Sequence, residues 1–126
     1  MLAKLRTRVS ALLLVAAASG ATQVRAEDVQ GVWTRDDGAV KVEFSACGGA
    51  VCGAVSWLKS ASGAAKVGQR VFSDMVRADQ ITWTGKAFNP EDGRTYSGKM
   101  VLSGKKLKTS GCVMGGLICK TVVWMR

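Results

Sequence analysis

The sequence predicts an all-β protein, a small antiparallel β-barrel of about six to eight strands. Apolar and polar side chains alternate through most of residues 27–126, a period of two that is typical of strands with one buried face. Turn residues recur about every eight to twelve positions, with almost no helical period between them. A closed barrel has no exposed edge strand, so we expect the last strand to pair with the first, around Val32 and Trp33.

The first half of residues 27–126 predicts a hairpin followed by a loop. Residues 40–44 alternate apolar and charged side chains after an Asp-Asp-Gly turn, as in a strand with one wet face. A Gly-Gly dipeptide at 48–49 then turns the chain, and Val55 and Trp57 fall on one face of the returning strand. Residues 59–68 are rich in Ala, Ser and Gly and have no apolar period, which indicates a loop.

The second half predicts a further series of hairpins. A strand begins at Ile81, and the Asn-Pro-Glu-Asp-Gly turn at 89–93 leads into a strand whose apolar face carries Tyr96. Residues 107–112 and 117–126 form two more strands around a Gly-Gly turn. The last strand alternates two sets of side chains, Cys119, Thr121 and Val123 against Lys120, Val122 and Trp124.

Residues 1–26 have the layout of a secretory signal peptide, with a basic start, an apolar run and small residues at the end. We place cleavage after Ala26, with Ala21 as a rival site. Residues 27–126 then form a single β-barrel domain. We expect this domain to lie in the periplasm or to be secreted. The apolar run is far shorter than the ~20 residues of a membrane span, so we expect no stable membrane insertion. An outer-membrane barrel is disfavoured because the strands are short and rich in lysine.

The four cysteines lie in two close pairs, Cys47 with Cys52 and Cys112 with Cys119. Each pair brackets a glycine-containing turn, so we prefer these two local disulfides among the three possible connectivities. The alternative is a four-cysteine zinc site, which the wide spacing of the second pair fits poorly. Disulfides indicate an oxidising compartment.

The charge of the chain is strongly basic, with a net value of +9, and residues 27–126 keep 14 basic and nine acidic side chains. Five lysines in the last third define a predicted basic face: Lys99, Lys105, Lys106, Lys108 and Lys120. An anionic envelope component is the partner that such a face would bind. The simpler interpretation is the solvated side of a hairpin. We expect no nucleic-acid partner, because no aromatic residues interleave with these lysines.

Four sequence blocks, in order and spacing, resemble a known family. They are Gly-Val-Trp with Asp-Gly at 31–38, residues 51–59, the segment QITWTGKAFNPEDGRTYSGKM at 80–100, and residues 111–126. Together they are similar to the bacterial exported family called domain of unknown function 2147. The resemblance implies a lipocalin-like β-barrel with an unassigned binding role, and it brings no catalytic residues. Residues 60–70 depart from the family pattern, because they are short and alanine-rich and lack an acidic Asn-Pro loop.

Aromatic side chains are the best candidates for a ligand pocket, because barrels of this kind bind apolar molecules in the interior or at the mouth. The candidates are Trp33, Trp57, Trp83, Tyr96 and Trp124. The alternative is that these rings fill the core of a barrel too small to be hollow.

Catalytic and metal-binding patterns are weak in this sequence. The chain contains no histidine, so its serines have no usual general base, although a Ser-Lys arrangement stays open. The two carboxylates of the 89–93 turn lack the alternating ligands of a calcium loop. We therefore expect no cofactor, no metal and no enzymatic activity.

Two functions remain as hypotheses. The first is a non-catalytic binding module for a small apolar or amphipathic ligand in the cell envelope. The alternative is an envelope protein-interaction or inhibitor module that acts through its loops and the basic face.

Overall fold

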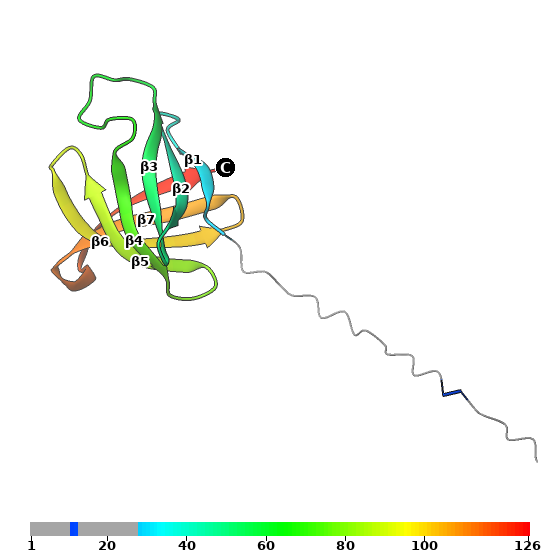
Figure 1. Ribbon diagram of the computed structural model, residues 1–126. Coiled ribbons are helices and arrows are strands. Elements are labelled where there is room, and N and C mark those ends of the chain that lie inside the picture. The colour runs from blue at the N-terminus through cyan, green and yellow to red at the C-terminus, as the bar shows by residue number, and fades with distance from the viewer. Residues whose placement is uncertain (1–10, 13–27) are drawn as a thin grey trace, which may run out of the picture.

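Eight antiparallel strands close into one barrel in the computed structural model, which describes residues 11–12 and 28–126 (Figure 1). The strands are β1 (Gly31–Arg35), β2 (Val40–Cys47), β3 (Ala50–Leu58), β4 (Arg70–Arg77), β5 (Thr82–Asn89), β6 (Arg94–Ser103), β7 (Lys106–Val113) and β8 (Ile118–Met125). A single-turn 3-10 helix, η1 (Met114–Gly116), joins β7 to β8. Each strand pairs with its sequence neighbours, and the predicted all-β barrel is confirmed.

The seam of the barrel is the pairing of β1 with β8. Thr34 lies opposite Met125, and Arg35 lies opposite Trp124. The prediction that the last strand pairs with the first is therefore confirmed. The paired residues of β1 are Thr34 and Arg35, which directly follow the predicted Val32 and Trp33. The predicted signal peptide and its cleavage after Ala26 lie outside the described residues, apart from 11–12, and stay predictions. Among the described residues, no helix is long and apolar enough to cross a membrane.

One strand, β4, was not predicted because its buried residues do not alternate. Val71 and Phe72 are adjacent and both are buried, and Met75 follows after three positions. A register shift interrupts the β4–β5 pairing between Ser73 and Val76, and Asp74 inside it has a φ of 52°. The irregularity changes which face each side chain points to, which removes the period of two from the sequence.

A second irregularity lies on β3 and reverses the direction of Trp57. Val55 lies opposite Val42, but Trp57 lies opposite Lys41, so Ser56 is an extra residue on β3. Trp57 is therefore on the opposite face from the buried Val55 and is exposed. The prediction that the two side chains share a face is wrong for this reason.

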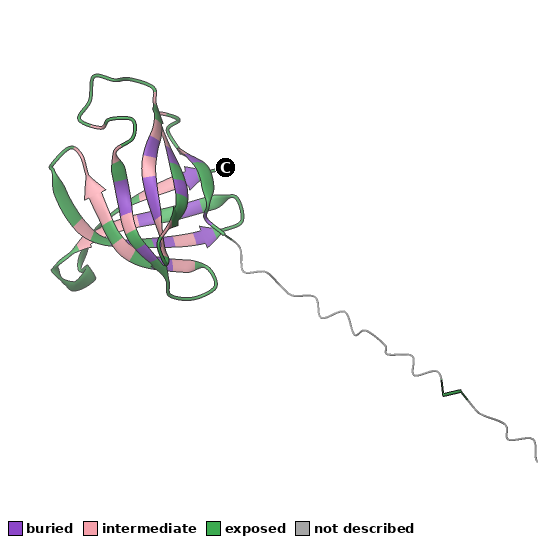
Figure 2. Ribbon diagram, in the orientation of Figure 1, coloured by how far each residue is buried: buried purple, intermediate pink, exposed green. Residues whose placement is uncertain are grey.

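One end of the barrel is closed by the segment before β1. Val29 is fully buried there and accepts a hydrogen bond from the Trp33 indole Nε1 at 2.8 Å. The guanidinium of Arg126 lies 4.3 Å from the centre of the Trp33 ring and covers it. Buried side chains concentrate in the middle of the strands and toward this end (Figure 2). The residues that fill it include Met75, Trp83, Met100, Leu102 and Leu107.

Both predicted disulfides are present, and none of the four cysteines is free. Cys47–Cys52 links β2 to β3 beside their turn, at the closed end, where that turn lies close to Asp28 and Gln30. Cys112–Cys119 links directly paired residues of β7 and β8 at the other end. Two disulfides are typical of a protein from an oxidising, extracytoplasmic compartment.

Candidate functional site

The open end of the barrel holds a cavity of about 1070 Å³. Its entrance is surrounded by the β1–β2 turn, by the β3–β4 loop over residues 59–65 and by the β5–β6 turn. In Figure 1 this loop, drawn in green, stands above the strands at the top of the molecule. Cavities of about 300–1000 Å³ are the usual size for small-molecule sites, so this one has room for one such molecule.

The floor of the cavity is apolar and aromatic. Phe72 and Trp124 line it, and their ring centres lie 6.3 Å apart in an edge-on arrangement. Phe44 lies behind them, 5.3 Å from Phe72. Val42 and Val55, which face each other across β2 and β3, complete this floor. A ligand that reaches this depth contacts hydrocarbon almost everywhere.

The polar groups at the floor already have partners. The Trp124 indole Nε1 donates to the Thr109 hydroxyl at 2.9 Å, and that hydroxyl donates to the Val122 carbonyl oxygen at 3.3 Å. Thr109 is the one polar or charged residue among the buried residues of the described chain. No buried side-chain nitrogen or oxygen in residues 28–126 lacks a hydrogen bond. The deep part of the cavity therefore offers no unsatisfied group to a polar ligand.

The mouth, in contrast, is charged. Four basic and two acidic side chains line the cavity: Arg35, Lys59, Arg94 and Lys120, with Glu91 and Asp92. The Arg35 guanidinium donates two hydrogen bonds to the Asp37 carboxylate, of 2.9 and 2.7 Å. This hydrogen bonding keeps the pKa of Asp37 at about 2. Lys59 and Lys120 form no ion pair within the described part of the chain. These two ammonium groups are thus available to a negatively charged ligand.

The β5–β6 turn is held by its own side chains. The Tyr96 hydroxyl donates a hydrogen bond to Asp92, which lowers the pKa of that carboxyl and raises the pKa of Tyr96. The other Asp92 oxygen accepts from the Arg94 amide at 2.9 Å, and Asn89 accepts from the Glu91 amide at 3.0 Å. Asp92 is therefore engaged in building the predicted turn and in positioning Tyr96 at the mouth.

The five aromatic candidates do not form one pocket. Tyr96 and Trp124 line the cavity, whereas Trp33 and Trp83 are buried in the packed closed end and Trp57 lies on the outside. The Lys41 ammonium lies 5.5 Å from the centre of the Trp57 ring, over the outer wall. The composition showed that aromatic side chains were available for a pocket, but strand register and the bulge on β3 decide which rings reach the cavity.

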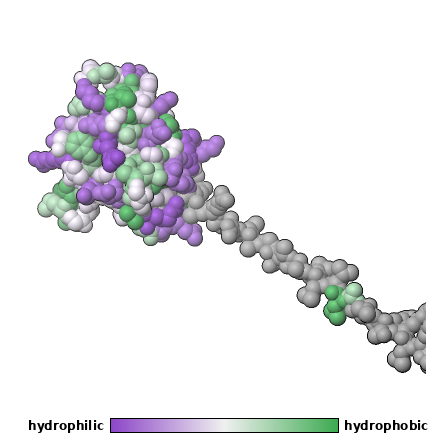
Figure 3. Space-filling view, viewed as in Figure 1, coloured by the Kyte–Doolittle hydropathy of each residue, from purple (hydrophilic) through white to green (hydrophobic). Residues whose placement is uncertain are grey.

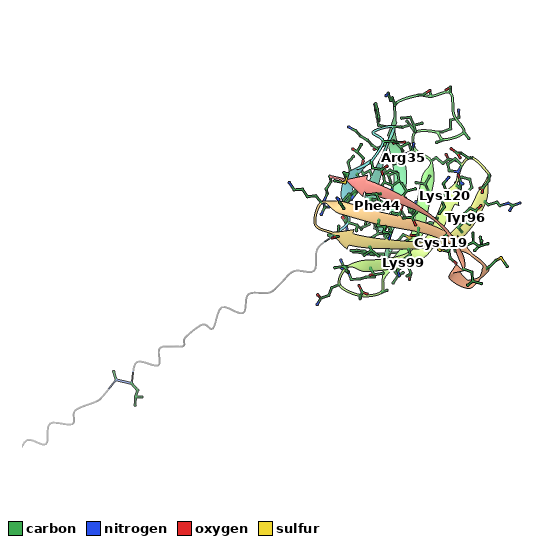
Figure 4. The ribbon with its side chains drawn as sticks, turned by 180° about the vertical axis from the view of Figure 1, so that it is seen from behind. Arg35, Phe44, Tyr96, Lys99, Cys119 and Lys120 are labelled. Atoms are coloured by element: carbon green, nitrogen blue, oxygen red, sulfur yellow. A yellow bond between two sulfur atoms is a disulfide. The ribbon has the colours of Figure 1, made fainter. Side chains whose placement is uncertain are left out.

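The five lysines of the predicted basic face are also divided. Lys99 and Lys108 point outward from β6 and β7, because their neighbours Met100, Leu107 and Thr109 are the buried, inward residues. Lys105 and Lys106 lie at the β6–β7 turn. Lys120 lies opposite Gly111 and shares the inward face of β8 with Val122 and Trp124, so it belongs to the cavity mouth. Figure 4 shows Lys120 near Tyr96, which also lines the cavity, and Lys99 farther from them.

The apolar walls were not identified from the sequence as site residues. Val40, Leu58, Val71 and Val122 line the cavity between its floor and its mouth. Alternation predicted the apolar face only for Val40, because Leu58 follows the bulge on β3 and Val71 lies on the unpredicted β4. Alternation also does not separate a hollow interior from a packed one. The alternation of Lys120, Val122 and Trp124 places one of the charges on the same face of β8 as the cavity.

Within residues 28–126, no three His, Cys, Asp or Glu side chains come together as a metal-binding group. The cavity combines an apolar floor with a mouth of mainly basic side chains.

A family model and a solved structure match this chain. The family model described as "Uncharacterized protein conserved in bacteria (DUF2147)" matches residues 31–126. Among solved structures, the chain is similar to protein HP1028 of the human pathogen Helicobacter pylori, which is described as belonging to the lipocalin family. That match has 21% identity and a TM-score of 0.67, and it covers 79% of this chain and 82% of the other. It supports a lipocalin-like fold. The comparison with curated proteins finds no match.

Proposed function

Since the chain belongs to this family of uncharacterised bacterial proteins and folds as a lipocalin-like barrel, we propose that it is a non-catalytic binding module for one small amphipathic ligand. The observation that carries the proposal is the contrast inside the cavity. Its floor is apolar with every polar group satisfied, and its mouth holds two lysines that form no ion pair with any residue the structure describes.

The contrast also gives the ligand an orientation. An apolar tail gains most by covering Phe72, Trp124 and the valines of the floor, because each buried CH₂ contributes roughly 0.8 kcal/mol. A polar or acidic end is best left at the mouth, where it stays partly hydrated and meets Lys120. The favoured ligand class is therefore a single-tailed amphiphile with an acidic head group.

We place this activity in the cell envelope, in the periplasm or outside the cell. The two disulfides and the predicted signal peptide with cleavage near Ala26 both support this location. The proposal includes no enzymatic step and no nucleic-acid partner. The hydroxyls of Thr109 and Tyr96, which lie in the cavity, are both engaged in hydrogen bonds that support the fold.

A cavity-filling substitution tests this proposal. Val122 and Val123 are adjacent on β8, but Val122 lines the cavity and Val123 lies opposite the outward Lys108. We expect Val122→Phe to weaken the binding of dodecanoate, measured by calorimetry, by at least about tenfold because the ring occupies the space of the tail. Val123→Phe should bind as the unchanged protein does.

The control for folding is the far-ultraviolet dichroism and thermal midpoint of both variants. If the unchanged protein binds neither dodecanoate nor dodecanol, or if the two variants lose affinity equally, the cavity is not the binding site. Native mass spectrometry of the protein purified from its host should in addition find a co-purified amphiphile.

The second candidate, an interaction or inhibitor module, has one observation in its favour. Lys99 and Lys108 project from the outer wall of neighbouring strands, away from the cavity. Retention of an envelope protein that weakens with salt and is unchanged in Val122→Phe would favour this function.

A further inference from the structure

The tip of the β7–β8 hairpin exposes large apolar side chains to solvent. Met114, Leu117 and Ile118 are 70%, 83% and 59% exposed, and Val113 beside them is also exposed. They lie within six consecutive residues that include no polar side chain. In Figure 3, hydrophobic surface appears at the corner of the molecule where Figure 1 shows this hairpin. A contiguous exposed apolar patch usually marks an interaction site.

The tip has a disulfide at its base. Val113 pairs with Ile118, and the Cys112–Cys119 disulfide joins the pair of residues directly below them. Gly115 and Gly116 both have positive φ, of 67° and 93°, which the turn of η1 requires. The disulfide joins the two strands of the hairpin at the base of the tip, and Met114 and Leu117 lie exposed beyond it.

The charge around the tip is net positive. The cavity mouth that adjoins the tip carries four basic side chains and two acidic ones, Glu91 and Asp92. Lys120 follows the tip by two residues and is exposed. An apolar tip beside a net basic surface is complementary to a bilayer with anionic head groups, since each of the two parts finds a favourable environment there.

We propose that the β7–β8 hairpin tip, defined as residues 113–118, docks this protein peripherally on an anionic lipid membrane. Met114 and Leu117 enter the interface between head groups and acyl chains, and the neighbouring lysines contact the head groups. The tip is continuous with the cavity, because Val113, Ile118 and Lys120 also line the entrance. Docking through this tip therefore places the entrance next to the membrane. The proposal stands on the exposed tip and the charge, independently of what the cavity binds.

Vesicle co-sedimentation tests this inference, with the protein purified as its host processes it. The probes are vesicles of equal parts phosphatidylglycerol and phosphatidylcholine, and vesicles of phosphatidylcholine alone. The double variant Met114→Ser/Leu117→Ser removes the wedge. The matched control is Val76→Ser/Ile81→Ser, which replaces two other exposed apolar side chains, 53% and 46% exposed, on β4 and the β4–β5 turn.

We expect the unchanged protein and the control to bind the anionic vesicles, with weaker binding at high salt, and the tip variant to lose at least about tenfold in partition coefficient. Absence of vesicle binding by the unchanged protein overturns the proposal, and so does an equal loss in both double variants. Sedimentation equilibrium tests the alternative that a second copy of the protein covers the tip. If the unchanged protein is a dimer and the tip variant is a monomer, the tip is an interface between two copies and the membrane proposal is wrong.

Discussion

The closed end and the open end of the barrel are made by the same eight strands, yet one is filled and the other is hollow. At the closed end, Trp83 on β5 faces Met100 on β6, and both are buried. Two residues further along, the facing pair is Gly85 and Gly98, and the next inward residue of β5 is Ala87. On β5, small side chains replace large ones as the strand approaches the mouth. The cavity therefore results from inward side-chain volume, without any change in strand topology.

The glycine pair between the two ends also brings strands together. A Cβ atom added to Gly85 would lie 2.4 Å from the carbonyl oxygen of Asp74, and one added to Gly98 would lie 3.0 Å from the carbonyl carbon of Lys86. Any side chain at Gly85 would push β4 and β5 apart. The lack of side chains at Gly85 and Gly98 thus allows neighbouring strands to approach closely, next to the packed Trp83–Met100 pair.

The largest expected effect comes from matched leucine truncations at the two ends. Leu107 is fully buried in the closed end, whereas Leu58 is half-buried in the cavity wall. We expect Leu107→Ala to lower the free energy of unfolding by about 3–5 kcal/mol, since it creates a void in close-packed surroundings. Leu58→Ala should lower it by only about 1 kcal/mol, because its space joins an existing cavity. Urea denaturation measures both, and equal losses would contradict a hollow open end.

A smaller effect is expected for matched lysine substitutions, which compare the mouth with the outer wall. Lys120 lines the mouth, and Lys108 points outward from the neighbouring strand. We expect Lys120→Gln to reduce the affinity for dodecanoate by roughly three- to tenfold and to leave dodecanol binding unchanged, because only the acid has a charge to pair.

Lys108→Gln should change neither affinity, and calorimetry with the two ligands distinguishes the possible failures. Equal dodecanoate binding in both variants would reject the head-group assignment and leave the cavity proposal standing. No binding of either ligand to the unchanged protein would reject the cavity proposal itself.

The smallest effect concerns acid, at the β1–β2 turn of the mouth. Hydrogen bonding from Arg35 lowers the pKa of Asp37 from its ordinary value of 3.8 to about 2. A depressed pKa means that the ion pair contributes stability fully above pH 3.8 and loses it as the pH falls through about 2. Carbon NMR of the Asp37 carboxyl should show this midpoint, and Arg35→Gln should move it up toward the ordinary value. A midpoint near 3.8 in the unchanged protein would contradict the pairing.

The sequence was sufficient to predict the all-β class, the closing contact of first and last strands, both disulfides and the loop between β3 and β4. Each follows from local rules, such as alternation, turn residues and short cysteine spacing. β4 and the direction of Trp57 could not be predicted, because a bulge shifts the phase of a strand and is visible only when the partner strand is present.

The candidate site was predicted only in part, since two of the five aromatic candidates, Tyr96 and Trp124, reach the cavity. Alternation assigns a side chain to the inner face of a strand, but it does not show how far along the barrel that side chain lies. That position depends on register, which separates the fully packed Trp83 from Trp124 at the cavity floor. For the same reason, the sequence analysis grouped Lys120 with the outward-facing lysines, although it lines the cavity mouth.

Mapping of ligand contacts by methyl NMR compares the two ends of the barrel in one experiment. On addition of dodecanoate, we expect chemical-shift changes for methyl groups in the cavity, such as those of Val40, Leu58 and Val122, and none for Met75, Met100 or Leu102 at the closed end. Saturable changes confined to outward-facing methyl groups, or no change in any methyl group, would contradict a ligand-binding open end.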